Sequence, residues 1–493
     1  TAPVVNLSVS SSSIAENAGS SITVTATMNF ATIIDTDITI STSGTALEGT
    51  DYGTVADITI SAGDTTGTAT FTPTDDSVYE GNETATITMA SITGANAGST
   101  TSQTITITEN DSTPVVTLAT SASSIAENAG SSLTLTATLS NATTANVTVT
   151  LSTSGTGTEG TDYSTISDIT ITAGATTGTV SFTPTDDNVY EGNETGIVAI
   201  DTVSGGSANE SGTPQVVTIT ITENESAPTV TLATSATSIA ENAGSSLTLT
   251  ATLSVATTAN VTVSLDGTGG TATEGTDFGT VSDITITAGS TTGTTSFTPT
   301  DDSIYDATSN ETAGISISAV SGGSATEDGN QAVTITITDN ESAPTVTLSR
   351  SSSAIDENSG STVTITATLS VVTFQDVTVS IDGTGGTGTE GTDFGTVSDI
   401  TISAGSTTGT AAVDPTDDSV YEGDETAGIS ISSVSGGGAS ESGSQSVTVT
   451  ITENESAPTV TLTSSASSIA ENAGSSLTLT ATISQVADED ITV

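Results

Sequence analysis

The chain of 493 residues has no Cys, no His and no Trp, and Arg350 is its single basic residue. Without His and Cys it lacks the softer metal ligands and the commonest catalytic bases and nucleophiles. The absence of disulfides fits either a reducing compartment or an exported bacterial protein that is stabilised by metal. The near absence of tryptic cleavage sites favours the exported protein.

The shortage of basic residues also restricts the partners of the chain. With 58 Asp and Glu residues, the formal net charge is −57. Nucleic acid is excluded as a partner because phosphate neutralisation requires Lys and Arg, and docking on anionic lipid is disfavoured for the same reason. We find no apolar run long enough to span a membrane and no signal peptide. Because the chain starts at Thr1 without Met and stops at Val493 in mid-phrase, we expect it to be a segment of a longer mature protein.

The acidic residues recur in the phrases IAENAG, EGTDY, PTDDSVYEGNET and ITEN, about every 114 residues. At an effective dielectric of ~20, two unit charges about 4 Å apart repel each other by roughly 4 kcal/mol. Since no basic side chains balance these clusters, we expect a cation to neutralise them. Ligands that are all oxygen favour the hard ion Ca²⁺.

The same period divides the chain into domains. The residues that open the successive repeats are Pro3, Pro114, Pro228, Pro344 and Pro458. We therefore expect complete repeats at residues 1–111, 112–225, 226–341 and 342–455, followed by a partial repeat at 456–493. The period is that of a whole domain rather than of a solenoid coil. Only a few residues and a Pro separate the repeats, so we expect a restricted angle at each joint.

Apolar residues alternate with Thr or Ser inside each repeat, as in SLTLTATL from Ser132. This period of two predicts strands with one buried face, about seven in each repeat, and no helix. The fold class is therefore all-β, in tandem immunoglobulin-like sandwiches that form an elongated array. Phe71, Phe182 and Phe297 recur at one strand position and are expected to pack the core, whereas Val413 replaces them in the fourth repeat.

The recurring phrases resemble those of the Calx-β domain, a family with a Glu-Asn-x-Gly turn, a Gly-x-Asp-Tyr stretch, an Asp-Asp-x-x-x-Glu-x-x-Glu segment and a terminal acidic cluster. All four occur in that order in every complete repeat. The resemblance implies a two-sheet Greek-key sandwich that binds Ca²⁺ in loops at one end. Such domains occur in sodium–calcium exchangers, in integrin β4 and in long arrays on bacterial surface proteins.

The resemblance implies a set of Ca²⁺ ligands at matching positions of the four repeats. In the first repeat they are Glu16, Asp51, Asp75, Asp76, Glu80, Glu83 and Asp111, with Glu109 as a further candidate. In the second they are Glu127, Asp162, Asp186, Asp187, Glu191, Glu194 and Glu225. In the third they are Glu241, Asp277, Asp301, Asp302, Asp306, Glu311 and Glu341. In the fourth they are Glu357, Asp393, Asp417, Asp418, Glu422, Glu425 and Glu455.

Two departures from the family pattern affect these sites. The terminal run reads Glu-Asn-Asp or Glu-Asn-Glu instead of a string of Asp, so one ion position is expected to be weak or absent. The third repeat has Asp306 in place of Glu and two extra residues before Glu311, so its geometry is expected to differ. The pair Asp75-Asp76 is expected at a strand end, with one carboxylate on each face of the chain.

Other interpretations of the acidic and polar residues are weaker. Four Asp residues in the phrase DITI, namely Asp57, Asp168, Asp283 and Asp399, could equally terminate a turn or bind metal. A glycosidase could use paired carboxylates, but no Trp offers a sugar platform and no repeat differs from the others as a catalytic domain would. Ice binding would need Thr rows at a short regular period. Glycosylation at Asn82 or Asn193 is disfavoured because these residues adjoin proposed ligands.

The sequence thus predicts a Ca²⁺-binding, Ca²⁺-rigidified repeat region that is not an enzyme. We expect it to form a stalk or filament of an extracellular, bacterial cell-surface adhesin. Its expected partners are Ca²⁺, neighbouring repeats of the same chain and other copies in a filament. The alternative is a Ca²⁺ sensor or buffer module in which ion binding changes the interdomain angle. A further alternative, the accessory region of an enzyme, would need a catalytic domain outside this sequence.

Overall fold

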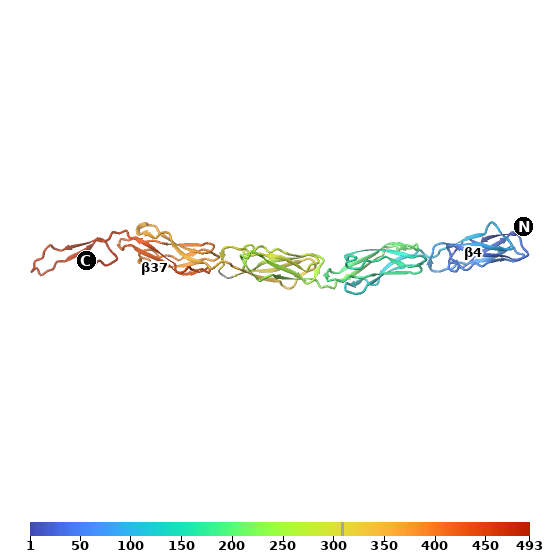
Figure 1. Cartoon of the computed structure of the whole chain (residues 1–493), viewed down its shortest axis with the longest axis horizontal. Helices are drawn as coiled ribbons and strands as arrows, with labels where there is room; N and C mark the ends of the chain where they lie inside the picture. The colour runs from blue at the N-terminus through green and yellow to red at the C-terminus, as the bar shows by residue number, and fades with distance from the viewer. Residues whose placement is uncertain (307–309) are drawn as a thin grey trace. The chain divides into compact units, whose positions relative to one another are not determined.

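A computed structural model describes residues 1–306 and 310–493, and in them the chain folds as β-strands and loops with a single 3-10 turn, Glu357–Ser359. The strands form four complete two-sheet sandwiches and a final hairpin, coloured in chain order from blue to red in Figure 1. The chain divides into two compact units, Thr1–Ala227 and Pro228–Val493, and each contains two of the sandwiches. None of the described residues lies in a helix long and apolar enough to cross a membrane.

The first sandwich shows the plan that the others repeat. Its four-stranded sheet has the order β6 (Thr66–Phe71), β3 (Ile22–Met28), β1 (Val4–Val9) and β9 (Asn96–Ala97). Its five-stranded sheet has the order β2 (Ser13–Ala15), β10 (Ser102–Thr108), β8 (Glu83–Thr93), β4 (Thr36–Gly44) and β5 (Ile58–Ile60). The expectation of about seven strands is met when β1 and β2 are taken as one strand that changes sheets and the two-residue β9 is set aside.

The remaining sandwiches follow the same order of strands. The second comprises β17 (Thr177–Phe182), β13 (Leu133–Leu139), β11 (Val115–Thr120) and β20 (Asn209–Glu210), with β12 (Ser124–Ala126), β21 (Val216–Thr222), β19 (Glu194–Ser204), β15 (Val147–Gly155) and β16 (Ile169–Ile171). The third comprises β28 (Thr292–Phe297), β24 (Leu247–Leu253), β22 (Thr229–Thr234) and β31 (Thr326–Glu327), with β23 (Ser238–Ala240), β32 (Ala332–Thr338), β30 (Glu311–Ser321), β26 (Val261–Gly270) and β27 (Ile284–Ile286).

The fourth sandwich comprises β39 (Thr408–Val413), β35 (Val363–Leu369), β33 (Thr345–Arg350) and β41 (Ser440–Glu441), with β34 (Ala354–Asp356), β42 (Ser446–Thr452), β40 (Glu425–Ser435), β37 (Val377–Gly386) and β38 (Ile400–Ile402). The hairpin of β43 (Val460–Ser464) and β44 (Leu479–Ile483) follows it. Strands of two residues that lie outside the sheets of the sandwiches are β7 (Val78–Tyr79), β14 (Ala142–Thr143), β18 (Val189–Tyr190), β25 (Ala256–Thr257), β29 (Ile304–Tyr305) and β36 (Val372–Thr373).

Each sandwich has its own apolar core, and an aromatic pair lies in three of the four. The rings of Tyr52 and Phe71 have centroids 4.6 Å apart, and the matching pairs of the second and third sandwiches are 4.6 and 4.9 Å apart. Phe71, Phe182 and Phe297 are fully buried, as predicted. In the fourth sandwich Val413 takes the place of the second ring, so Phe394 loses the favourable aromatic contact.

The recurring Asp of the phrase DITI has a structural role in each sandwich. The pairing of β4 with β8 shifts register between Thr39 and Ile40, which frees the N–H of Ile40, and this N–H donates to Oδ1 of Asp57 at 2.8 Å. Asp168, Asp283 and Asp399 accept the N–H of the equivalent bulge residue. These carboxylates therefore satisfy the N–H that a β-bulge frees, a role that neither alternative of the sequence analysis described.

Thr36 is an irregularity of the first core. It pairs with Ile60 at the start of β4, where the other sandwiches have a fully buried Val paired with Ile. Its side chain is fully buried, and among the described residues its Oγ1 has no hydrogen-bond partner. A buried hydroxyl without a partner destabilises a fold.

Replacing Thr36 by Val should therefore stabilise the first sandwich by about 1–3 kcal/mol, because the orphaned hydroxyl is removed without a change of shape. Differential scanning calorimetry of the whole chain should show one transition moving to higher temperature. Thr39→Val is the matched control, because Thr39 is exposed on the same strand and its change should have little effect. Equal shifts in the two variants would contradict a specific cost at Thr36.

Candidate metal centre

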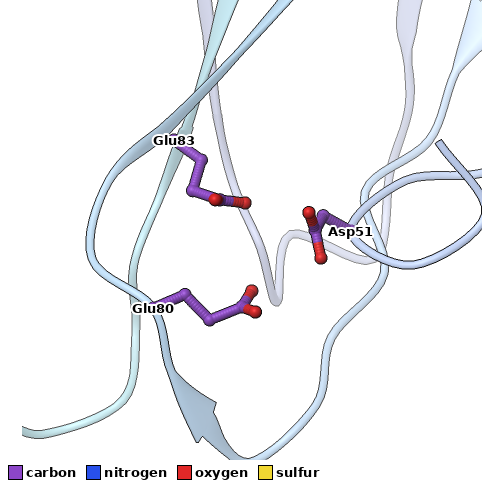
Figure 2. A group of neighbouring side chains, drawn as sticks. All are labelled: Asp51, Glu80 and Glu83. Carbon is purple, nitrogen blue, oxygen red and sulfur yellow. The ribbon is translucent and has the colours of Figure 1, made fainter. Parts of the chain in front are cut away.

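Carboxylates from separate loops converge at one end of the first sandwich. Asp51 comes from the loop between β4 and β5, Glu80 follows β7, and Glu83 begins β8. One carboxylate oxygen from each lies within 4.8 Å of the others, and Figure 2 shows the three side chains pointing toward a shared space. Asp162, Glu191 and Glu194 form the same group in the second sandwich. We call each such group the loop cluster.

Local structure fixes the members of the loop cluster. The N–H of Leu47 donates to Oδ2 of Asp51 at 2.6 Å, and the neighbouring Tyr52 is buried in the core. Gly81 has a φ of +76°, which allows the tight turn that returns the chain from Glu80 to Glu83. The core and two turns therefore aim these side chains inward before any ligand is considered.

A second group of carboxylates lies at the joint between a sandwich and the residues that follow it. In the second sandwich Glu127, Glu223 and Glu225 each place one oxygen within 4.8 Å of the others. The same arrangement recurs in the next two sandwiches as Glu241, Asp339 and Glu341 and as Glu357, Glu453 and Glu455. We call each such group the joint cluster.

The Asp-Asp pair lies in the loop after β6, not at a strand end as predicted. β6 ends at Phe71, and Pro73 then bridges Tyr52, so that Asp75 and Asp76 follow in irregular backbone. The N–H of Asp76 donates to Oε1 of the buried Glu16 at 3.2 Å.

The same contact joins the second Asp of each pair to the buried Glu of the IAEN phrase or its counterpart: Asp187 to Glu127 at 3.4 Å, Asp302 to Glu241 at 2.9 Å and Asp418 to Glu357 at 3.1 Å. Burial raises the pKa of both Glu80 and Glu16, and the charge of Asp76 adds to the rise in each.

One set of acidic residues was missed by the sequence analysis. Glu109 was only a further candidate, and its counterparts Glu223, Asp339 and Glu453 were not chosen. The Glu109 carboxylate accepts four backbone N–H groups, those of Glu80, Gly81, Asn110 and Asp111, at 2.7–2.9 Å. Burial raises the pKa of Glu109, but these four hydrogen bonds outweigh it and hold the pKa below its usual value.

Glu223 and Glu453 repeat this role, and the pKa of Glu453 falls to about 2. The side chain of Asn82 completes the link in the first sandwich, because its Oδ1 accepts the N–H of Glu109 at 3.0 Å. These residues tie the turn of the loop cluster to the joint. The recurrence of ITEN, or ITDN in the third repeat, was the available signal, but the sequence analysis chose the residue two positions after its Glu or Asp.

The acidic residue two positions after Glu109 or its counterpart carries an unsatisfied oxygen in every complete repeat. Asp111 Oδ2, Glu225 Oε2, Glu341 Oε2 and Glu455 Oε2 are buried and have no hydrogen-bond partner among the described residues. A buried carboxylate oxygen without a partner is costly. A cation held by oxygen ligands would satisfy it, so the residues present fit Ca²⁺.

The electrostatics of the loop cluster agree with this fit. Burial and then the charge of Asp51 raise the pKa of Glu80 from 4.5 to about 7. Burial likewise raises the pKa of Glu83, Glu194, Glu311, Glu422 and Glu425 to about 7. These groups resist ionisation because they lie near other acids in a desolvated site without basic residues.

The third repeat has a shorter acid at the position of Glu109. Oδ2 of Asp339 accepts the N–H of Asp306 at 2.9 Å and Oδ1 accepts that of Glu341 at 2.7 Å, as Glu109 does with the matching residues of the first repeat. The two extra residues before Glu311 fall at 307–309, which lie outside the described residues.

The fold and the site define a series of β-sandwiches, each with oxygen-only acidic clusters at one end. Four successive segments, residues 1–111, 109–225, 223–341 and 339–455, match the Calx-beta domain, and the chain belongs to that family. Among curated proteins no relative matches.

Solved structures similar to this chain include domains of CALX, an integrin-binding protein and an adhesin. CBD12 from CALX1.2 is 15% identical, with 44% of this chain and 99% of that chain covered and a TM-score of 0.21. The bacterial integrin-binding protein invasin is 14% identical, with 94% and 82% covered and a TM-score of 0.23. The Yersinia pseudotuberculosis adhesin InvE is 18% identical, with 44% and 58% covered and a TM-score of 0.23.

The raised pKa values predict how pH affects the metal-free protein. A carboxyl whose folded pKa rises from 4.5 to about 7 stabilises the fold fully below pH 4.5, and this contribution disappears as the pH rises through 7. The melting temperature of metal-free protein should therefore fall between about pH 5 and pH 8. With Ca²⁺ in excess it should rise over the same interval, because protons compete with the cation. Calorimetry in both conditions tests this, and parallel pH profiles would contradict it.

Proposed function

We propose that this chain is a Ca²⁺-binding, Ca²⁺-rigidified repeat region that forms a stalk or filament of an extracellular cell-surface adhesin. The observation that carries the Ca²⁺ proposal is a buried carboxylate oxygen at the same joint position of all four complete repeats, which has no hydrogen-bond partner within residues 1–306 and 310–493. The Calx-beta matches cover residues 1–455, and this supports a structural role for the chain.

The proposed ligands are the seven acidic positions predicted for each repeat, together with Glu223, Asp339 and Glu453 and their counterpart Glu109. Separate loops supply them, which gives a set of carboxylates able to provide the six to eight oxygens that Ca²⁺ requires. The loop cluster and the joint cluster share the Asp-Asp segment, so more than one ion position is expected in each repeat. The number of ion positions is expected to be lower in the repeats that end in Glu-Asn-Glu.

The mechanical part of the proposal rests on where the joint cluster lies. Asp111 is three residues before Pro114, which opens the next repeat and is buried. When the carboxylates of Glu16, Glu109 and Asp111 are neutralised together, the backbone of the joint loses its freedom to move away from the sandwich. A series of such joints stiffens the chain, which is what a stalk requires.

The alternative is a Ca²⁺ sensor or buffer whose interdomain angle follows the ion level. The loop cluster recurs in the first two repeats, the joint cluster in the second to the fourth, and the Glu–Asp contact in all four. This uniformity favours the stalk, because a sensor needs only one or two tuned domains. A stalk also agrees with the strong negative charge, which keeps neighbouring repeats from collapsing onto one another.

Removing the charges of the Asp pair in one repeat should remove the affinity of that repeat alone. For the double variant Asp186→Asn and Asp187→Asn, isothermal titration calorimetry should show the loss of one repeat's share of bound Ca²⁺, because each change deletes a charge that the cation needs. Asp201→Asn is the control, because Asp201 is exposed and outside both clusters. Full binding in the double variant would mean that the pair is not a ligand, and no Ca²⁺ binding by the unaltered chain would overturn the proposal.

The stalk predicts a change of dimension on metal removal. Small-angle scattering of the full chain should give a longer mean end-to-end distance in Ca²⁺ than in chelator, because freed joints bend. Charge repulsion acts in the opposite sense, so the comparison is made at high salt, where the Debye length falls to about 3 Å at 1 M. If Ca²⁺ binds but the two distance distributions coincide, the buffer alternative replaces the stalk.

A further inference from the structure

A short backbone contact recurs at the joints between repeats. β7 pairs in parallel with β14 of the second repeat, with Tyr79 opposite Thr143. β29 and β36 pair in the same way between the third and fourth repeats. After the fourth repeat, Tyr421 lies opposite Ala487, just beyond β44, in a parallel bridge. We call the joint between the first and second repeats the first joint and the joint after the fourth repeat the last joint.

The register of this contact sets a metal-cluster residue beside the next repeat. The residue after the Tyr is Glu80 at the first joint and Glu422 at the last joint. Extended by one residue, the register places Glu80 beside Thr144 and Glu422 beside Asp488. At the last joint the N–H of Asp488 also donates to the carbonyl of Tyr421 at 3.2 Å. Residues in register on parallel strands, about 4.8 Å apart, direct their side chains to the same face.

The last joint thus sets an acid against an acid, whereas the first joint sets an acid against a neutral residue. Asp488 begins an acidic run that continues with Glu489 and Asp490. The residues at these positions of the second repeat are Thr144, Ala145 and Asn146. Like charges directly opposite each other destabilise a pair of strands. The last joint therefore needs a positive charge that its own side chains do not supply.

The charge of Asp488 reaches the metal cluster of the preceding repeat. Asp393, Glu422 and Glu425 are the fourth repeat's counterparts of the loop cluster, and Asp393 is only 9% exposed. Burial and then the charge of Asp393 raise the pKa of Glu422 and of Glu425 to about 7, and the charge of Asp488 adds to both rises. At the first joint the charges that chiefly raise the pKa of Glu80 all belong to its own repeat.

A hollow between the two repeats lies at the same place. Its volume is about 180 Å³, and its lining includes Glu422 of the fourth repeat and Glu489 and Asp490 of the segment after β44. Tyr421 and Ala487, the residues of the parallel bridge, also line it. Carboxylates of two successive repeats therefore border one space, and none of the lining residues is basic.

We propose that the cation of the fourth repeat's loop cluster is shared with the next repeat, and that Asp488 is a ligand to it across the last joint. This inference rests on the proposed Ca²⁺ binding. Because Ca²⁺ takes six to eight oxygens, a fourth carboxylate beside Asp393, Glu422 and Glu425 has a place in its coordination. The ion then holds the last joint directly, and its removal leaves Glu422 and Asp488 to repel each other. The first joint lacks this dependence because Thr144 carries no charge.

Disulfide formation can measure docking at each joint, because the chain has no Cys of its own. Val78→Cys with Ala142→Cys reports on the first joint, where these two residues are paired. Val420→Cys with Val486→Cys occupies the equivalent positions of the last joint. Paired strands are about 4.8 Å apart, within the Cα separation that a disulfide accepts. The quantity compared is the initial rate of disulfide formation in Ca²⁺ divided by that in chelator, for the full chain at fixed ionic strength.

This rate ratio should be roughly fivefold to tenfold larger at the last joint than at the first, because chelation leaves two facing acids without a counter-charge. The triple change Asp488→Thr, Glu489→Ala and Asp490→Asn, which installs the residues of the second repeat, should lower it to the value of the first joint. Conversely, Thr144→Asp should raise the ratio at the first joint.

Glu471→Gln is the matched control. It removes one charge from the turn between β43 and β44, at the opposite end of that hairpin from the last joint, and should leave the rate ratio unchanged. A fall equal to that of the triple change would mean that net charge alone governs docking, which would overturn the shared site.

The shared site is also overturned if the two joints of the unaltered chain give equal ratios, if the triple change leaves the ratio of the last joint as it was, or if Thr144→Asp has no effect. Titration calorimetry of the same proteins separates these results from a failure of the proposed function. Ca²⁺ binding with equal ratios removes only the shared ion, whereas absence of Ca²⁺ binding removes both.

Discussion

The mutual repulsion of carboxylates without basic partners is the constraint on which this structure depends. Ordinary proteins balance buried acids with Arg or Lys, and this chain has one such residue. Its acids are instead gathered at one end of each sandwich, where backbone N–H groups stabilise some of them and leave others with unsatisfied oxygens. The site is therefore incomplete by its own chemistry, and the proposed Ca²⁺ completes it.

The core of each sandwich holds the loops that carry the acidic clusters in position. Alternating apolar residues bury one face of each sheet, and the core places Tyr52 and its counterparts beside the Asp of the loop cluster. The carboxylate of Glu109 then connects the turn at Gly81 to the joint, so hydrogen bonds link two loops that are distant in sequence. Through this link, cation binding at the loop cluster would be felt by the backbone of the joint, which leads into the next repeat.

The structure brings together several of the acidic residues that the sequence singled out, and it gives two recurring acids a role that the sequence did not assign. Asp57 and Glu109 both recur in every repeat, and recurrence alone does not separate a bulge acceptor or a backbone anchor from a metal ligand. Asp57 accepts an N–H from a residue 17 positions away, and Glu109 accepts one from 29 positions away. Hydrogen bonds of this kind exist only after the strands have paired, so no local pattern reveals them.

The sequence by itself determined the repeat, the all-β class, the core aromatic residues and the concentration of unbalanced acids, because period, β-propensity and net charge are properties of the chain. Only the tertiary structure decided which acids anchor the backbone and which oxygens lack partners. It alone also showed that a two-residue strand of one repeat docks on a loop of the next. Partners for buried polar atoms come from segments brought together by packing, and two residues are too short to carry a periodic signal.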